Sequence, residues 1–141
     1  MTQADIEALF RKHAWEEAYH AAVEWVRLHP TNAWAHAYLG LALDRMKRPE
    51  DAVPCFERAV SLDAGFWQAG TYLVRILDRL GKYEQALLVA EEFHRQRPSD
   101  ENLRIMVDGL RRHAKANRTD GWERTANLTW HEVNVNSPDQ F

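Results

Sequence analysis

The chain has 141 residues, of which 45% are hydrophobic and 28% are charged, a balance typical of a folded globular domain rather than of a disordered chain. The formal net charge of −3 argues against nucleic acid as a partner, because such proteins carry a basic surface. No stretch approaches the roughly 18 consecutive apolar residues of a membrane-spanning helix, so membrane insertion is not expected.

The opening sequence MTQADIEALFRK is amphipathic and acidic, and it lacks the basic stretch and apolar stretch of a secretion signal. We therefore expect a cytoplasmic protein. The single cysteine, Cys55, rules out an internal disulfide and a cysteine-based zinc site. The sequence predicts neither a metal nor a cofactor.

Helical periodicity dominates the chain from its start. Apolar residues recur at helical spacing through Ile6 and Phe10, and then through Trp15, Ala22 and Trp25, and this doublet returns further along. Turn chemistry in HPTN, SLDAG and RPSD separates the helical stretches. These patterns predict helices at residues 2–12, 15–28, 33–46, 49–62, 66–80, 83–96 and 99–117.

An internal repeat with a period of 34 residues underlies these helices. Ala18, Ala52 and Ala86 fall into one column at this offset, and Pro30 and Pro98 fall into another. Small residues in such a column let two antiparallel helices approach closely, whereas bulky residues fill the seam between units. The same offset also aligns Leu43 with Leu77, Tyr38 with Tyr72, and Asp44 with Asp78.

A repeat of this length with these residue types resembles the tetratricopeptide repeat (TPR) family. The middle unit carries the resemblance best, with Leu39 and Gly40 followed by Ala52, Phe56 and Ala59. The third unit departs from the family pattern, since it has Gly70 where the family has tryptophan and Val74 where it has glycine. The resemblance implies an all-α, right-handed superhelical stack of antiparallel helix pairs. Its units are expected at about 1–31, 32–65 and 66–98, with a capping helix at 99–117 that completes a TPR domain over 1–118.

Such a stack places the first helix of each pair on a concave surface, and the protein-binding groove of the family lies there. By helical phase, the resemblance places Trp34, Tyr38 and Leu41 from the second unit in this groove. The complete set of groove candidates is Arg11, Trp34, Tyr38, Leu41, Arg45, Gln68, Tyr72, Arg75, Arg79, Met106 and His113.

A basic column within this set admits two interpretations. Arg11, Arg45, Arg79 and His113 fall at intervals of 34 residues, so their side chains could form a row that receives an extended acidic segment, helped by flat aromatic anchors. Alternatively, Arg45 and Arg79 pair with Asp44 or Asp78 in a ladder between units. The sequence leaves both interpretations open.

No catalytic constellation is evident, so an enzyme is not expected. There is no phosphate-binding glycine-rich loop and no nucleophile with a convincing base. Some family members clamp a C-terminal carboxylate with lysines and asparagines, but the corresponding positions here read Gln3, Glu7, Tyr38, Gln68 and Tyr72. The sequence therefore favours a non-catalytic adaptor or small assembly subunit, and a dedicated chaperone similar to the small three-repeat export chaperones is the alternative.

The last residues, 119–141, differ from the repeats. Asp120, Glu123, Glu132 and Asp139 outnumber the single Arg124 and account for the whole net charge. We expect an extended tail that docks on a repeat groove, its own or a neighbour's, or on a partner protein. The apolar docking candidates are Trp122, Leu128, Trp130, Val133, Val135 and Phe141.

Overall fold

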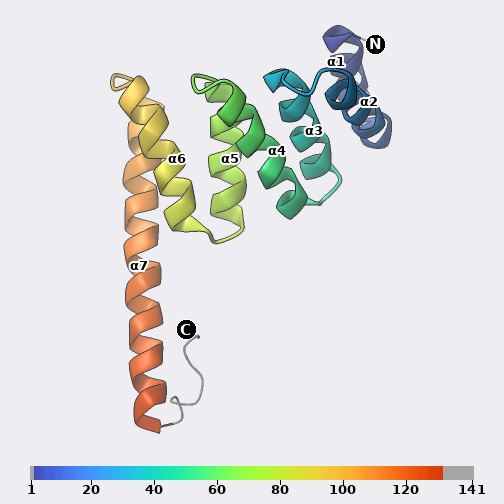
Figure 1. Ribbon diagram of the computed structural model, residues 1–141. Helices are drawn as coiled ribbons and strands as arrows, with labels where there is room; N and C mark the ends of the chain where they lie inside the picture. Colours follow the sequence, from blue (N-terminus) through green and yellow to red (C-terminus); the bar gives the residue numbers. More distant parts are fainter. Residues whose placement is uncertain (1, 132–141) are drawn as a thin grey trace.

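The computed structural model describes residues 2–131, with side chains described as far as residue 116. The described residues form seven helices and no strand, which confirms the predicted all-α stack of helix pairs. The helices are α1 (Gln3–Arg11), α2 (Trp15–Leu28), α3 (Ala33–Arg45), α4 (Pro49–Leu62), α5 (Trp67–Arg79), α6 (Tyr83–Gln96) and α7 (Glu101–His131). Each helix packs on the next along the chain, and α3, α5 and α7 all begin at the same end of the stack (Figure 1).

Side-chain caps mark the starts of α1 and α3. The Thr2 hydroxyl accepts a hydrogen bond from the Asp5 backbone N–H, and the Asp5 carboxylate accepts one from the Thr2 N–H, which satisfies two of the unpaired donors at the start of α1. Asn32 caps α3 in the same sense, because its side-chain oxygen accepts from the backbone N–H groups of Trp34 and Ala35. Such caps fix where α1 and α3 begin, whereas α2, α4, α5 and α6 begin without a side-chain cap bond.

The backbone itself repeats every 34 residues at the turn inside each helix pair. His13, Lys47 and Gly81 occupy equivalent positions, and all three have left-handed φ values of 58°, 65° and 77°. Only glycine adopts this conformation without steric cost. The three units therefore share one turn geometry, although only the third has the residue that the geometry favours.

The core combines fully buried alanines with two close approaches between glycine and phenylalanine. Ala18, Ala52 and Ala86 are all 0% exposed, as their common column predicts. In the second unit Gly40 admits the ring of Phe56, and in the third unit Gly70 admits the ring of Phe93: a Cβ built on either glycine would lie under 3.0 Å from ring carbons. Each glycine thus provides the space into which a large side chain packs.

The C-terminal part differs from the sequence prediction. The capping helix predicted to end at residue 117 continues to His131, so residues 119–131 are helical rather than extended. The reason is that no proline lies between Pro98 and Pro138, and every backbone N–H in this stretch is free to bond to the carbonyl four residues earlier. Trp122, Leu128 and Trp130 lie on this helical segment, whereas Val133, Val135 and Phe141 lie outside the described residues.

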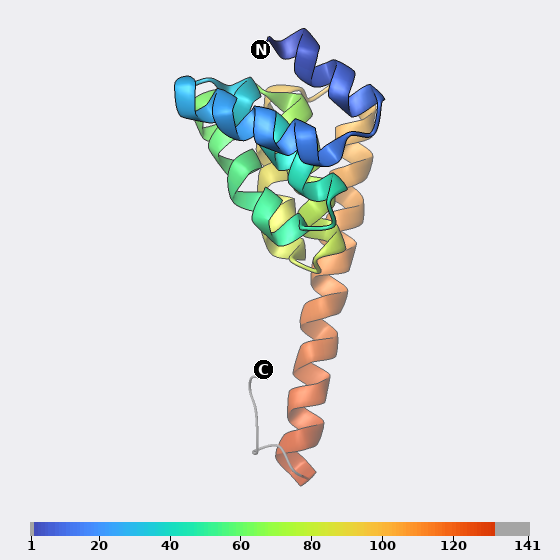
Figure 2. The same ribbon diagram turned by 90° about the vertical axis from the view of Figure 1, so that its right-hand side faces the viewer.

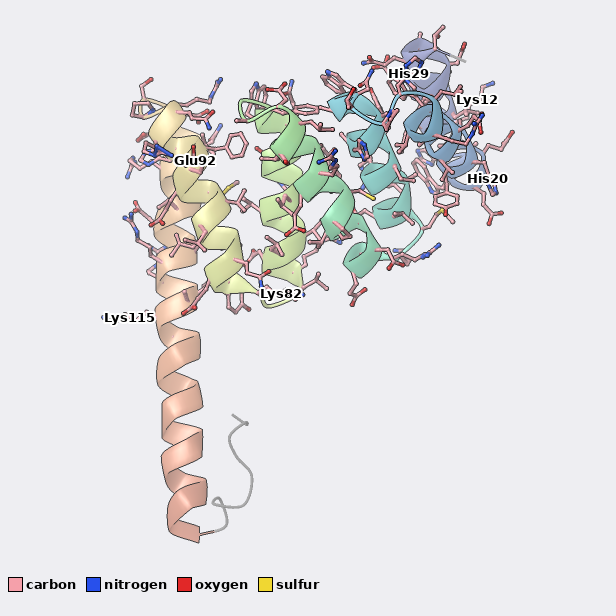
Figure 3. All side chains as sticks on the ribbon, viewed as in Figure 1. Lys12, His20, His29, Lys82, Glu92 and Lys115 are labelled. Atoms are coloured by element: carbon pink, nitrogen blue, oxygen red, sulfur yellow. The ribbon has the colours of Figure 1, made fainter. Side chains whose placement is uncertain are left out.

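The added length of α7 projects from the stack. Lys115 on α7 lies near the level of Lys82, which precedes α6, and the helix continues well past both (Figure 3). The view from the side shows the same projection away from the end of the stack where α3, α5 and α7 begin (Figure 2). The C-terminal end of α7 at His131 therefore lies away from the repeats.

Candidate binding groove

An apolar pocket of about 220 Å³ lies between α3 and α5. Trp34, Tyr38 and Leu41 contribute from α3, and Gln68 and Tyr72 contribute from α5. The structure thus brings together five groove residues predicted from helical phase. The full lining is Trp34, Ala37, Tyr38, Leu41, Phe56, Phe66, Gln68, Ala69 and Tyr72.

Four of the lining residues were missed by the sequence prediction. Ala37 and Ala69 are small, and Phe56 was considered only as part of the repeat pattern. Phe66 lies at the N-cap of α5, whereas the prediction made it the first residue of the helix at 66–80. Its ring centroid is 4.5 Å from that of Trp34, and an aromatic residue directly before the first helical turn was the signal that could have identified it.

Contacts between aromatic rings hold the pocket wall in place. Tyr38 is at the centre, with ring centroids at 5.6 Å to Phe10, 6.0 Å to Trp25 and 5.9 Å to Trp34. On the α5 side, the Tyr72 ring stacks on Phe56 at 5.7 Å and 12°. Ring pairs at these separations are favourable, so the pocket is formed before any ligand arrives.

Trp34 combines rigidity with access. It is 38% exposed although it contacts both Phe66 and Tyr38. A fixed, partly exposed tryptophan is a good binding anchor, because little conformational entropy is lost when a ligand covers it.

One end of the groove is acidic. The Tyr38 hydroxyl donates a 2.6 Å hydrogen bond to Glu7 Oε2 on α1, and the Gln3 side-chain amide donates a second at 3.3 Å. These two bonds hold the pKa of Glu7 below its usual value, because they stabilise the carboxylate. Burial and the bond to Glu7 raise the pKa of Tyr38 to about 12. Glu7 is therefore ionised and Tyr38 neutral near pH 7.

The basic column predicted from the repeat is engaged with acidic residues. Arg79 Nη2 is 2.7 Å from Asp44 Oδ1, and Arg45 Nη1 is 3.5 Å from Asp44 Oδ2. His113 Nδ1 lies 3.7 Å from Asp78 Oδ1, which repeats the Asp44–Arg79 contact one unit later. This is the ladder between units that the sequence allowed as the alternative.

Arg45 and Arg11, the first two members of this column, have neighbours outside the ladder. The Arg45 guanidinium also lies 5.9 Å above the Trp15 ring, and position 10, where an acid would complete the ladder, is Phe10. Arg11 follows Glu7 by one helical turn and contributes to the low pKa of that carboxyl.

Arg75 differs from the column arginines. Its guanidinium lies 5.8 Å from the centroid of the Tyr72 ring, and it is exposed. Within residues 2–116 no carboxylate forms an ion pair with it. Arg75 also borders a second hollow of about 200 Å³ between α5 and α7, to which Met106 and His113 contribute. It therefore presents an unpaired positive charge beside the aromatic pocket.

Other classes of site find no support among the described side chains. No group of three or more His, Cys, Asp or Glu residues there could hold a metal ion. Within the described part of the chain, no helix combines the length and the apolar character needed to cross a membrane.

These observations define the class of the protein: a helix-pair solenoid with a preformed aromatic pocket on the first helices of its pairs. The family model of the tetratricopeptide repeat matches residues 33–66, the unit that carries α3 and α4. No curated protein sequence matches the chain.

Solved structures show the same fold. MamA from Desulfovibrio magneticus RS-1, residue 41 to the end, matches with a TM-score of 0.72 at 20% identity, over 81% of this chain and 64% of the MamA chain. The second TPR domain of human RPAP3, in complex with the HSP70 peptide SGPTIEEVD, matches with a TM-score of 0.69 at 17% identity, over 77% of this chain and 91% of that domain. The TPR2B domain of yeast Sti1, in complex with pHsp70, matches with a TM-score of 0.68 at 19% identity, over 82% of this chain and 94% of the Sti1 domain.

The chain has the fold of tetratricopeptide-repeat domains. Residues 33–66 match the repeat in sequence, and the helix pairs on both sides continue the same fold. The chain spans less than two thirds of the length of the MamA chain that it resembles.

Proposed function

We propose that this protein is a non-catalytic adaptor that binds a segment of a partner protein in the pocket between α3 and α5. The observation that carries the proposal is the preformed apolar pocket, with Trp34 fixed by two aromatic neighbours and still 38% exposed. Bulky aromatic anchors in pockets dominate the energetics of protein interfaces. The RPAP3 domain in complex with an HSP70 peptide and the Sti1 domain in complex with pHsp70 share the fold, and this supports a role in binding a partner segment.

The chemistry of the groove argues against a C-terminal carboxylate as the ligand at its α1 end. The ionised Glu7 lies there and is bonded to Tyr38, so a second carboxylate would meet a like charge. Arg75 provides the opposite sign beside Tyr72. The proposed ligand is therefore a segment with a bulky apolar side chain for the pocket and an acidic group directed toward α5, with the C-terminal segment as a second contact.

Two tryptophans provide a matched test. Trp34 and Trp67 lie in the first turns of α3 and α5 and are 38% and 44% exposed, but only Trp34 lines the pocket. Random peptides displayed on phage are selected on the full chain, and their affinities are then measured by fluorescence anisotropy. We expect Trp34→Ala to weaken the selected peptides by about tenfold or more, and Trp67→Ala to change their affinity by less than about twofold.

Equal affinities for the two variants and the wild type would contradict the pocket as the binding site. The composition of the selected peptides tests the alternative function. A dedicated chaperone would select unrelated apolar sequences, whereas an adaptor selects one class with a bulky apolar residue near an acid.

A further inference from the structure

The pocket and Arg75 form a site with two contact points that share Tyr72. The Tyr72 side chain lines the pocket, and the Arg75 guanidinium lies 5.8 Å from its ring centroid. In an extended segment, side chains two residues apart point to the same face and lie about 7 Å apart. A ligand with an acidic residue two positions from a bulky apolar residue would therefore reach both points.

The chain contains such a pair in its own C-terminal segment. Asp139 and Phe141 are separated by Gln140 alone, and Pro138 directly precedes them. Proline lacks a backbone N–H and disfavours helix at the residue before it, so this stretch is suited to an extended ligand. Acidic and apolar residues of the segment thus match a basic and aromatic groove in sign and in spacing.

The direction of α7 disfavours the pocket of the same chain as the binding site, because the C-terminal segment would have to be fully extended to reach it. Met106 is the counterpart of Tyr72 at the 34-residue offset, and the 25 residues from Met106 to His131 on α7 rise about 38 Å away from the pocket level. The ten residues from Glu132 to Phe141 reach at most about 36 Å when fully extended. The pocket also lies beyond α5, about 10 Å to the side, and the projection of α7 is visible in Figures 1 and 2.

We propose that the pocket receives the C-terminal segment of a second copy of this chain, with Phe141 in the apolar pocket and Asp139 on Arg75. Reciprocal exchange of the two segments closes a symmetric dimer, because each copy offers one groove and one segment. The inference rests on the proposed function, since it names the occupant of the same pocket.

A charge-swap experiment on the full chain tests the proposal. Sedimentation equilibrium is run at about 1 to 200 μM, which brackets the Kd of a contact of this kind. The wild type is expected to dimerise in this range. Arg75→Glu and Asp139→Lys are each expected to weaken self-association by about tenfold, because each places like charges opposite one another.

Mixing the two variants gives the decisive readout. In the mixed dimer, Glu at position 75 of one copy faces Lys at position 139 of the other, and the second contact is the wild-type pair. We therefore expect an equimolar mixture to dimerise again with an affinity near that of the wild type, which two misfolded proteins would not do. Arg58→Glu is the control, because Arg58 on α4 is exposed, does not line the pocket, and has no ion pair among the described side chains.

Three results would overturn the proposal: a wild type that stays monomeric throughout the range, single variants that associate like the wild type, or a mixture that fails to regain the dimer. The phage selection separates this failure from failure of the proposed function. A monomeric protein whose selected peptides still depend on Trp34 retains the adaptor function and loses only self-docking. A monomeric protein without Trp34-dependent peptides loses both.

Discussion

Three helical glycines give opposite predictions for the same substitution. A Cβ at Gly70 would lie 2.3 Å from Cε2 and 2.6 Å from Cζ of Phe93, and a Cβ at Gly40 would lie 2.8 Å from Cε2 of Phe56. At Gly109 on α7, the nearest atom is the flexible Arg112 Nη2 at 3.9 Å. Alanine therefore clashes with a buried ring at Gly40 and at Gly70, whereas at Gly109 it has open space.

The magnitudes follow from two opposing terms. Replacing glycine by alanine inside a helix stabilises it by about 1 kcal/mol, and at Gly109 we expect this gain alone. At Gly70 the Phe93 ring is 3% exposed. A buried ring is costly to displace, so we expect overpacking to cost about 3 kcal/mol, and the net effect is a loss of about 2 kcal/mol. At Gly40 the contact is less severe, and we expect a net loss of up to about 1 kcal/mol.

Urea unfolding followed by far-ultraviolet circular dichroism measures all three variants against the wild type. The expected order of stability is Gly109→Ala, wild type, Gly40→Ala and Gly70→Ala. Adding Phe93→Leu to Gly70→Ala removes the clashing ring atoms, so the double variant should lose at least about 1 kcal/mol less than the sum of the two single losses. A Gly70→Ala protein as stable as Gly109→Ala would refute the packing argument.

Three further predictions concern single side chains. Lys47→Gly should raise the free energy of unfolding by about 0.5–1 kcal/mol in the same assay, because Lys47 has a φ of 65° and glycine adopts this conformation without a steric penalty. Tyr38→Phe should remove one phenolate step near pH 12 from the ultraviolet titration. It should also remove the stabilisation that the raised pKa of Tyr38 contributes, which is present below the ordinary tyrosine pKa of 10.0 and lost as the pH rises toward 12. The stabilisation that the lowered pKa of Glu7 contributes, present above the ordinary glutamate pKa of 4.5 and lost as the pH falls below it, should be reduced as well. Arg79→Glu should lower the free energy of unfolding by about 1–2 kcal/mol, because it places a second carboxylate beside the 7% exposed side chain of Asp44. The solvent exposure of Arg79 keeps this loss below that of a fully buried pair. An unchanged unfolding curve would show that the contact between Arg79 and Asp44 contributes nothing to stability.

The fold was predictable because the repeat constrains many positions at once. The alanine column at 18, 52 and 86 required a close helix approach, and all three alanines are 0% exposed. The third unit was harder to interpret, since Gly70 and Val74 depart from the family pattern. The structure supplies the reason: Phe93 approaches Gly70 in that unit, whereas Phe56 approaches Gly40 in the second. Such compensation depends on which side chains meet across two helices, and a periodicity argument does not contain that information.

The pocket was partly predictable for a related reason. Helical phase placed Trp34, Tyr38 and Tyr72 on the concave side, and all three line the pocket. Phase did not select Phe66, because the prediction placed it inside the helix at 66–80, whereas in the structure it is the N-cap of α5 and its ring lies against Trp34. The stretch 119–131 was predicted wrongly because its weak apolar periodicity was taken as an extended segment, whereas the helical hydrogen bonds of α7 need no apolar stripe to continue.

The pairing of the basic column changes which charge is available for a ligand. Asp44 is 7% exposed and engages both Arg45 and Arg79, so a ligand carboxylate approaching either arginine would compete with a partner that is already in place. Arg75 has no such competitor among the described side chains, and it lies against the aromatic ring that also lines the pocket. An ion pair formed on binding contributes more when the charge it uses was unpaired before. Arg79 therefore serves the contact between units and Arg45 shares its carboxylate, and Arg75, outside that column, is the arginine that we assign to the ligand.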